Sequence, residues 1–364
     1  MPQTVALVHD YLTQRGGAER VVLSLTRAFP DAPLYTSLYD PDGTFPEFED
    51  VDVRTLPIDR VSPLRKSHRF AFPLLAPAFS ALRIDADVVV CSSSGWAHGA
   101  RTTGRKIVYC HAPARWLYQP DRYLGGAGPL PRAALAAMRA PLTRWDRRAA
   151  HSADRYLANS TAVATAIRDA YGIDSEVVHP PITIDPDAPR EPVAGIEPGF
   201  LLCVSRLLPY KNVGPIVDAA AQLGDVRLVV VGAGPELARI RARATPRVSL
   251  LGSVTEAQLR WLYAEAGGLV AASYEDFGLT PLEAAGFGKP SVALRWGGFL
   301  DTIDEFRTGL FFDTPTSSAV ADAIREVHHA KWQTSEIVAT AARFSELRFI
   351  ERIRAIVGAA REVH

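Results

Sequence analysis

Two glutamates, Glu275 and Glu283, lie in the stretch of the sequence whose residue types and spacing best suit chemistry. The strand-like run Leu269–Ala272 precedes them, and a helix is predicted to begin between them, with Thr280 as its N-cap and Pro281 in its first position. The free backbone N–H groups and the dipole at the start of a helix favour an anion such as a phosphate. The two carboxylates can then accept hydrogen bonds from neutral hydroxyl groups. A phosphate and several hydroxyls together describe a sugar nucleotide.

A pair of cations lies earlier in the same half of the chain. Arg206 follows the strand-like run Gly199–Val204, and Lys211 stands just before the predicted helix Val213–Leu223. An arginine can bind a phosphate through two N–H groups, and a lysine acts as a compact positive charge. Together they can neutralise a diphosphate. A solvated loop is the alternative interpretation. We favour a ligand site because the two glutamates belong to the same half of the chain.

A histidine follows another buried-type strand in the first half. The runs Asp87–Ser92 and Lys106–Cys110 are nearly continuous in apolar residues, as expected for parallel strands that are covered on both faces. His111 comes directly after the second run. Ligands of open α/β sheets bind at the carboxyl ends of the strands, so His111 is well placed for a functional role. A purely structural histidine is the alternative, and the sequence leaves both interpretations open.

The elements that must position these residues alternate between strand and helix along the whole chain. The first unit of this kind joins Val5–Val8 to a helix over Ala18–Phe29 through the glycine pair Gly16 and Gly17, where the backbone must come close to another group. This alternation predicts an α/β protein of two facing Rossmann-like domains, each a doubly wound parallel sheet, with a cleft between the domains. The predicted divisions are an N-terminal domain over 1–185, a proline-rich linker over 186–198, a C-terminal domain over 199–343, and a last helix within 344–364 that packs back across the junction.

Composition excludes several classes of protein. The 364 residues contain 40 Lys+Arg and 40 Asp+Glu, so no overall field attracts nucleic acid or an anionic membrane. No apolar run approaches the length of a membrane-spanning helix, and a strand begins almost at residue 1, so we expect a soluble, cytoplasmic protein. The three cysteines are expected to be buried reduced thiols. No metal site is expected, because no aspartate pair with one residue between its members stands in a strand–loop setting that would chelate a divalent cation. Asp85 and Asp87 have the spacing, but they precede their strand and so lie at the wrong end of the sheet.

Two further segments have alternative interpretations. Val61–Leu82 mixes basic and aromatic residues, which suits either a surface that meets a lipid-linked acceptor or a membrane, or an internal helix pair packed on the sheet. We favour the helix pair because its prolines interrupt any long amphipathic helix. Gly232-Ala233-Gly234 begins a dinucleotide-binding pattern, but Leu237 stands where its third glycine is required, so no NAD site is expected.

The motifs together resemble those of a known family. They are Gly16-Gly17-Ala18-Glu19 near the start, Ser205-Arg206-Leu207 with Lys211, and the run from Glu275 through Asp276-Phe277-Gly278-Leu279 to Glu283. In this order they resemble family 4 of the retaining glycosyltransferases, which have the GT-B fold of two facing Rossmann-like domains and work without a metal. Three further stretches resemble a branch of bacterial mannosyltransferases that assemble surface polysaccharides: His9-Asp10-Tyr11, Tyr109-Cys110-His111-Ala112-Pro113 and Val178-His179-Pro180-Pro181.

The resemblance implies roles for the matching residues. Glu283 would accept hydrogen bonds from the ribose hydroxyls, whereas Glu275 and the backbone of Phe277–Leu279 would hold hydroxyls of the donor sugar. Arg206 and Lys211 would stabilise the leaving diphosphate. No carboxylate nucleophile is evident on the N-terminal side, which agrees with front-face return of the acceptor within an ion pair.

The N-terminal half would complete the site. Gly16 and Gly17 would let a loop reach the phosphate or the acceptor, and His111 would contact the sugar near its reacting carbon. Backbone groups of the loop Gly252-Ser253-Val254 would bind the base. The remaining donor-binding positions belong to the same motifs: Ser205, Asp276, Gly278 and Thr280.

The resulting hypothesis is a retaining hexosyltransferase of glycan, polysaccharide or glycosylated natural-product biosynthesis. It would move a hexose, with mannose from GDP-mannose or a UDP-sugar as the expected donor, to a sugar or lipid-linked acceptor, without a cofactor or metal. The acceptor would dock on the N-terminal domain, where Val61–Leu82 and Asp121–Gly128 contain no recognisable motif, and this domain would also make any peripheral contact with the inner face of a membrane. The alternatives are a pseudo-glycosyltransferase or sugar-phosphate synthase on the same fold, and a nucleotide-sugar-binding protein without turnover. The oligomeric state is not predicted.

Overall fold

A computed structural model describes residues 3–66, 68–120 and 129–359, and the segment 121–128 lies outside this range. The chain divides into two compact units. The first contains Met1–Pro181 together with Glu346–His364, and the second contains Ile182–Ser345. Within the described residues, no helix has both the length and the apolar character needed to cross a membrane.

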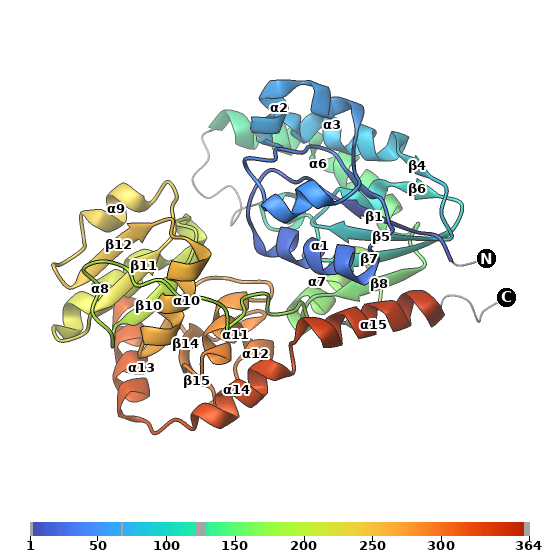
Figure 1. Cartoon of the computed structure of the whole chain (residues 1–364). Coiled ribbons are helices and arrows are strands. Elements are labelled where there is room, and N and C mark those ends of the chain that lie inside the picture. The colour runs from blue at the N-terminus through green and yellow to red at the C-terminus, as the bar shows by residue number, and fades with distance from the viewer. Residues whose placement is uncertain (1–2, 67, 121–128, 360–364) are drawn as a thin grey trace. The chain divides into compact units, whose positions relative to one another are not determined.

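The first unit is built on a seven-stranded parallel sheet (Figure 1). The strand order is β3-β2-β1-β5-β7-β8-β9, so the order reverses between the neighbours β1 and β5. A small two-stranded sheet pairs β4 with β6. The strands are β1 (Val5–His9), β2 (Leu34–Thr36), β3 (Val53–Thr55), β4 (Arg83–Ile84), β5 (Val88–Ser93), β6 (Arg101–Thr102), β7 (Arg105–Cys110), β8 (Arg155–Ala158) and β9 (Glu176–Val177).

Helices cover both faces of this sheet. One buried cluster joins the sheet to α3 and α7, and the other joins it to α1 and α15. The last helix, α15, follows the second unit in sequence but packs beside α1 in the first, as Figure 1 shows. The helices are α1 (Gly17–Ala28), α2 (Ser62–Lys66), α3 (His68–Ala81), α4 (Arg115–Tyr118), α6 (Pro129–Ala150), α7 (Thr161–Tyr171) and α15 (Glu346–Gly358), with short 3-10 turns η1 (Pro46–Asp50), η2 (Pro57–Arg60) and η3 (Ala97–Gly99).

The second unit repeats this plan with six parallel strands in the order β12-β11-β10-β13-β14-β15. The order reverses between β10 and β13, which pair directly. The strands are β10 (Leu201–Val204), β11 (Leu228–Val231), β12 (Val248–Gly252), β13 (Gly268–Ala271), β14 (Ser291–Leu294) and β15 (Gly309–Phe312). The helices are α8 (Val213–Leu223), α9 (Leu237–Arg241), α10 (Glu256–Glu265), α11 (Leu279–Gly286), α12 (Phe299–Thr302), α13 (Ser317–His329) and α14 (Thr334–Ala342), with the 3-10 turn η4 (Pro209–Lys211).

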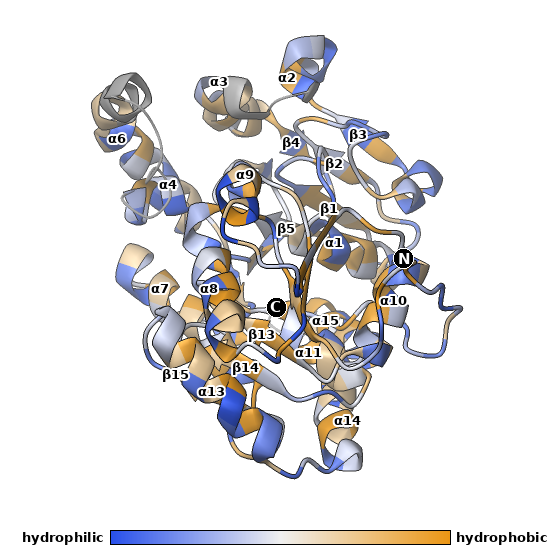
Figure 2. Cartoon of the chain, turned by 90° about the vertical axis from the view of Figure 1, so that its left-hand side faces the viewer, coloured by the Kyte–Doolittle hydropathy of each residue, from blue (hydrophilic) through white to orange (hydrophobic). Residues whose placement is uncertain are grey.

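Amphipathic helices explain how the sheet of the second unit is covered. Figure 2 shows α13 with both hydrophobic and hydrophilic residues, and its Val320, Ile324 and Val327 are buried in one cluster with the strands. The predicted linker 186–198 belongs to the second unit, where Val193 and Ile196 pack against buried residues. The two parallel α/β sheets confirm the predicted fold class.

Two helices differ from the predictions. The prolines of Val61–Leu82 do not interrupt α3: Pro73 and Pro77 lie inside a continuous helix. Burial of Leu75 and Phe79 in the core stabilises this helix although each proline removes a backbone donor. The predicted pair of helices packed on the sheet is present as α2 and α3. In the second unit, the helix predicted over 236–244 is shorter and covers only Leu237–Arg241.

Candidate donor site and histidine corner

Four charged residues of the second unit gather where its strand order reverses, and we call them the charged corner: Arg206, Lys211, Glu275 and Glu283. Arg206 and Lys211 follow β10, whereas Glu275 follows the neighbouring strand β13. Glu283 lies on α11, the helix that continues from β13. The carboxyl ends of strands beside such a reversal form the usual ligand crevice of doubly wound sheets.

Lys211 and Glu275 form an ion pair across the charged corner. Lys211 is only 8 % exposed, whereas the Glu275 carboxylate is partly open to solvent and also accepts a hydrogen bond from Ser273 Oγ at 3.2 Å. The side-chain amide of Asn212 donates to the carbonyl of Ala272 at 2.9 Å, which ties the loop after β10 to the end of β13. The charges are therefore held together by the strand neighbours rather than by closeness in sequence.

Glu283 is a buried carboxylate with one identified partner. The hydroxyl of Tyr263, from α10, donates to its Oε2 at 2.6 Å. Tyr263 is itself buried and stacks on Phe287, with ring centroids 5.6 Å apart. Sequence analysis did not identify Tyr263, because it occupies an apolar helix position with no motif around it. The phenol therefore fixes one of the two carboxylate oxygens.

The start of α11 differs from the prediction. The helix begins at Leu279, with Gly278 as its N-cap, so Thr280 and Pro281 lie inside the first turn rather than at the N-cap and first position. Gly278 has φ of 84°, a left-handed conformation that favours glycine, and a Cβ there would lie 2.4 Å from the ring of Phe299. The early start leaves the N–H groups of Leu279 and Thr280 without partners within the helix, directly after Asp276 and Phe277.

A second glycine pair, Gly297 and Gly298, shapes the loop that bears Glu275, and no predicted role was attached to it. The N–H of Gly298 donates to the carbonyl of Glu275 at 3.1 Å. A Cβ on Gly298 would lie 2.1 Å from the Cα of Phe277, so a side chain would displace this loop. The sequence does carry a signal, because the glycine pair follows the strand-like run Ser291–Leu294, and glycines often mark a close approach of two backbone segments.

The other predicted donor-binding residues lie at the same edge of the sheet. Ser205 directly follows β10, and exposed Arg206 reaches toward the hydroxyl of Tyr210. Gly252 ends β12, and Ser253 and Val254 follow it. The side chain of Phe277 is buried in an apolar cluster, so only the backbone at that position can face a ligand.

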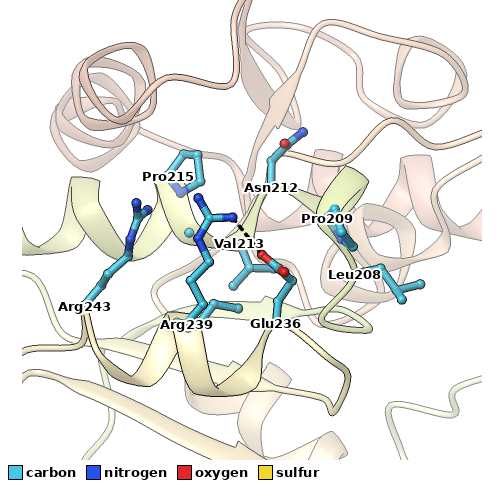
Figure 3. A pocket seen from close by; sticks show the side chains of 10 residues that line it. Leu208, Pro209, Asn212, Val213, Pro215, Glu236, Arg239 and Arg243 are labelled. Atoms are coloured by element: carbon cyan, nitrogen blue, oxygen red, sulfur yellow. Dashed lines mark hydrogen bonds and ion pairs between the residues drawn. The ribbon is translucent and has the colours of Figure 1, made fainter. Parts of the chain in front are cut away.

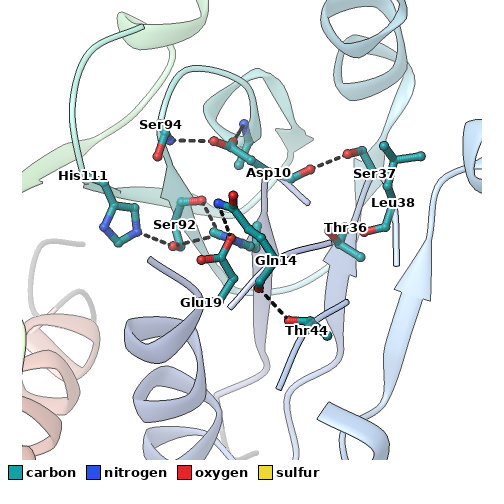
Figure 4. A network of polar contacts seen from close by, with 12 residues as sticks. Asp10, Gln14, Glu19, Thr36, Ser37, Leu38, Thr44, Ser92, Ser94 and His111 are labelled. Atoms are coloured by element: carbon teal, nitrogen blue, oxygen red, sulfur yellow. Dashed lines mark hydrogen bonds and ion pairs between the residues drawn. The ribbon is translucent and has the colours of Figure 1, made fainter. Parts of the chain in front are cut away.

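Polar residues also lie at the corresponding edge of the first unit, and we call them the histidine corner: His9, Asp10, Glu19, Ser92 and His111. Figure 4 shows Asp10, Glu19, Ser92 and His111 of this corner. The Oγ of Ser92 lies 2.7 Å from Nε2 of His111 and 3.1 Å from Nδ1 of His9. The carboxylate of Asp10 accepts hydrogen bonds from three backbone N–H groups in the short segment after β5, those of Ser94, Trp96 and Ala97. All five residues are buried.

Burial and neighbouring charges shift the titration of both histidines. Burial, with contributions from His9 and Arg115, lowers the pKa of His111 to about 3. Burial also lowers the pKa of His9, but Glu19, Asp10 and the carbonyl of Ser92 favour its charged form, and the net direction of its pKa is upward. His111 is therefore a neutral imidazole at physiological pH.

The predicted glycine pair lies beside this corner. Gly16 is the N-cap of α1, which begins at Gly17 rather than at the predicted Ala18. A Cβ on Gly16 would lie 2.5 Å from Oε2 of Glu19, so the glycine permits the close approach of this buried carboxylate. Gln14 donates to Oε1 of Glu19 at 3.0 Å, and Oε2 has no hydrogen-bond partner among the described residues.

A cavity of about 330 Å³ lies elsewhere in the second unit, at the starts of α8 and α9 (Figure 3). Its charged lining residues are already engaged, since Arg239 pairs with Glu236 at 3.2 Å and Arg243 pairs with Asp218 at 2.9 Å. The predicted donor-binding residues do not line it. The structure thus brings the predicted residues of each unit together at its strand ends.

Comparison with known proteins identifies the family. The family model for glycosyl transferases group 1 matches residues 187–344, and the model for Glycosyltransferase Family 4 matches residues 15–186. The GDP-mannose-dependent alpha-mannosyltransferase of Mycobacterium tuberculosis is 31% identical over 287 residues, which cover 70% of each chain. The D-inositol 3-phosphate glycosyltransferase of Mycobacteroides abscessus is 30% identical over 198 residues, which span 48% of this chain but only 44% of that relative.

Solved structures agree on the fold. Anabaena HepE, crystallised with UDP-glucose, covers 98% of this chain and aligns over its whole length with a TM-score of 0.73, at 19% sequence identity. The fold is therefore GT-B, as the sequence motifs predicted. Together with the strand order of both units, these matches show that the chain belongs to the family 4 (group 1) glycosyltransferases.

Proposed function

We propose that the protein is a retaining, metal-independent hexosyltransferase that moves a hexose from a nucleoside diphosphate sugar to a sugar or lipid-linked acceptor. The observation that carries this proposal is the charged corner, in which a buried carboxylate, an exchangeable ion pair and the start of α11 converge at the strand ends. The expected donor is GDP-mannose, as for the M. tuberculosis relative, or a UDP-sugar, as bound by HepE.

The ion pair between Lys211 and Glu275 suggests how the donor is received. A diphosphate carries more charge than one carboxylate and can take over Lys211, which releases Glu275 to accept hydrogen bonds from sugar hydroxyls. Glu283, already oriented by Tyr263, would accept from the ribose hydroxyls through its second oxygen. Arg206 would add a second cation to the diphosphate. Binding thus exchanges one buried ion pair for another, so Lys211 never becomes an unpaired buried charge.

The same groups would lower the barrier to transfer. Departure of the nucleoside diphosphate develops negative charge, and the fixed cations with the N–H groups at the start of α11 stabilise it. A contact of this kind is worth roughly 2.7–4 kcal/mol of transition-state stabilisation. Lys211 and Arg206 supply the positive charge that a divalent cation provides in other enzymes. We therefore expect transfer to continue when divalent ions are chelated.

The acceptor would bind to the first unit, and His111 would contact the sugar near its reacting carbon. The first unit would also contact the inner face of a membrane. Val61 and Leu74 support this contact, because they expose apolar side chains around α2 and α3. Flotation of the protein with vesicles containing anionic lipids would test this contact. Vesicles without anionic lipids serve as the comparison.

A thermal-shift screen with GDP, UDP, ADP and their sugars tests the donor proposal directly. A nucleotide at about 100 times its Kd adds about 2.7 kcal/mol of stability, which corresponds to a rise in Tm of roughly 5–10 °C for a domain of this size. The ligand that produces the shift is then supplied with candidate acceptors, and the anomeric configuration of the product is determined by NMR. A glycoside with the donor's configuration supports the proposal.

Two variants test whether the nucleotide-induced rise in Tm depends on the charged corner. Glu283→Gln should abolish most of the nucleotide-induced shift, whereas Glu326→Gln, an exposed glutamate of α13, should leave it unchanged. A phosphate or C–N linked product would instead identify a synthase or pseudo-glycosyltransferase. Nucleotide binding without release of diphosphate across a wide acceptor panel would identify a binding protein.

A further inference from the structure

The hydroxyl of Ser92 lies between two buried histidines of the histidine corner. Its Oγ is 2.7 Å from Nε2 of His111 and 3.1 Å from Nδ1 of His9. The same nitrogen of His9 is also 3.1 Å from the backbone carbonyl oxygen of Ser92. His9 comes from β1 and Ser92 from the adjacent strand β5, with the two residues paired in register. His111 directly follows β7, which pairs with β5 on its other side.

The carbonyl fixes the direction of the hydrogen bonds. A carbonyl oxygen only accepts, so Nδ1 of His9 must carry a proton to approach it. The same N–H then points at Oγ of Ser92, which therefore acts as an acceptor on this side. The single hydroxyl proton of Ser92 is left to donate to Nε2 of His111. His111 consequently keeps its own proton on Nδ1.

Glu19 completes this arrangement from α1. Its Oε1 lies 3.9 Å from Nε2 of His9 and accepts a hydrogen bond from Gln14. A buried carboxylate facing Nε2 favours a proton on that nitrogen as well, so His9 carries both ring protons. The backbone of Gly16 approaches this carboxylate where a side chain would collide with it. The order of groups is therefore Glu19, His9, Ser92 and His111.

We propose that His9 and Ser92 are positioning residues that hold His111 as a neutral imidazole with its Nδ1–H directed toward the substrate. No described residue bonds this Nδ1, and His111 keeps 9 % of its surface exposed. His111 would act as a hydrogen-bond donor to a sugar oxygen and not as a general base, because the only basic nitrogen of its ring is occupied by Ser92. This inference rests on the proposed function, in which His111 contacts the donor sugar.

The test compares two adjacent serines in the full-length protein. Ser92 and Ser93 are both buried on β5, and both hydroxyls contact histidine side chains. Ser92 Oγ contacts His9 and His111, whereas Ser93 Oγ lies 2.9 Å from Nδ1 of His98. Ser92→Ala should release the tautomer of His111, whereas Ser93→Ala is the matched control that leaves it fixed. Two-dimensional ¹H–¹⁵N NMR of the ¹⁵N-histidine-labelled protein reports which ring nitrogen carries the proton.

Kinetics of the same variants give the second readout. Ser92→Ala should lower kcat roughly 10- to 100-fold with little change in KM for the donor, the range seen when the partner that orients a functional imidazole is removed from metal sites. Ser92→Thr, which keeps the hydroxyl, should restore the wild-type tautomer and most of kcat. If Ser92→Ala does not fold, as judged by circular dichroism, His9→Gln is measured in its place and should also release the tautomer.

Either of two NMR results would overturn the proposal: a wild-type His111 with its proton on Nε2, or an unchanged Nδ1–H tautomer in a folded Ser92→Ala or His9→Gln protein. An equal loss of kcat in Ser92→Ala and Ser93→Ala would also count against it. The NMR readout requires no turnover, so it separates this inference from the proposed function. A protein without transfer activity whose tautomer still depends on Ser92 would refute the proposed function alone.

Discussion

The two units share a strand order but use the corner beside its reversal differently. In the second unit, the charged corner is held by an ion pair between Lys211 and Glu275, and the glutamate is partly open to solvent. In the first unit, the histidine corner is buried and hydrogen-bonded through strand neighbours, and its aspartate is fixed by three backbone N–H groups. One fold thus holds a partly exposed ion pair at this place in one unit and a buried polar network in the other.

This difference follows from what lies between strand and helix in each unit. The loop after β13 passes through Gly278 into α11 and leaves polar side chains partly open to solvent. In the first unit, His9 at the end of β1 and Asp10 directly after it are both buried, so their polar atoms must find partners within the protein. We therefore expect the charged corner to bind a ligand, whereas we expect the histidine corner to orient a single residue, His111.

Lys211→Ala should produce the largest effect, because it removes the cation of the ion pair in the charged corner. We expect kcat/KM to fall roughly 100- to 1,000-fold, which corresponds to about 2.7–4 kcal/mol of lost stabilisation of the leaving group. Lys289→Ala, three residues beyond the C-terminal end of α11, provides the control and should be near wild type. Steady-state kinetics with both variants would contradict the assignment if Lys211→Ala retained full activity.

Gly278→Ala should distort the charged corner without removing a charge. The left-handed φ and the contact of a new Cβ with Phe299 should cost about 2 kcal/mol of stability and displace the start of α11. Calorimetry should show a weaker affinity for the nucleotide, together with a lower Tm. Gly224→Ala also changes a glycine with positive φ but meets no neighbouring atom within 4 Å. It should lower the Tm while leaving the affinity unchanged.

His111 predicts a pH dependence of stability that originates in the fixed corner. Its pKa is about 3 in the folded protein, below its ordinary value of 6.5. The unfolded chain therefore takes up a proton as the pH falls below about 6.5, while the folded protein does not, so stability decreases toward acid. Wild type should lose about 1.4 kcal/mol more than His111→Gln for each pH unit between about 6 and 4.

Urea denaturation at several pH values measures this difference. His328→Gln, an exposed histidine on α13, should instead follow the wild-type profile. His9 works in the opposite direction: its raised pKa contributes stability at low pH that is lost as the pH rises through the folded value. A His111→Gln profile parallel to that of wild type would show that His111 titrates normally and that the corner does not hold it neutral.

Thr255→Ala should produce the smallest effect and tests whether α10 supports the charged corner. Thr255 and Gln258 form a capping box at the start of this helix, which bears Tyr263 at its far end. Loss of the cap should cost about 1 kcal/mol of stability, and nucleotide affinity should stay within a few-fold of wild type. Thr316→Ala removes the cap of α13 and is the comparison. A much larger loss of nucleotide affinity in Thr255→Ala would show that α10 helps to hold the charged corner in place.

Local patterns in the sequence predicted the parts of the fold that depend on neighbours along the chain. The helix α8 has the predicted bounds Val213–Leu223. The sequence also predicts Ser160 or Thr161 as the cap of one helix and Thr255 at the capped start of another; Ser160 caps α7 and Thr255 caps α10. The alternation of strands and helices predicted two parallel sheets, and the residues after each strand end predicted which loops gather at one edge. These signals arise from periodicity and from capping chemistry, which act over a few residues.

Contacts between distant segments could not be predicted in the same way. The hydrogen bond from Tyr263 to Glu283 and the ion pair from Lys211 to Glu275 depend on which strands become neighbours, and no pattern within either segment records this. Similarly, nothing around Ser92 indicates that two histidines will meet its hydroxyl. The unbroken α3 shows the same limit, because burial of Phe79 and Leu75 in the core stabilises the helix despite its prolines.

The position of α15 has a consequence for synthesis of the chain. Its Phe349, Ile353 and Ile356 are buried in one cluster with Leu7, Val21 and Leu25, so the apolar core of the first unit is finished by residues translated after the whole second unit. On the ribosome, α1 must therefore wait with part of its apolar surface uncovered while some 160 residues of the second unit emerge. Folding of this protein cannot proceed strictly from its first residue to its last, and a nascent chain arrested before Glu346 should bind chaperones through that uncovered surface.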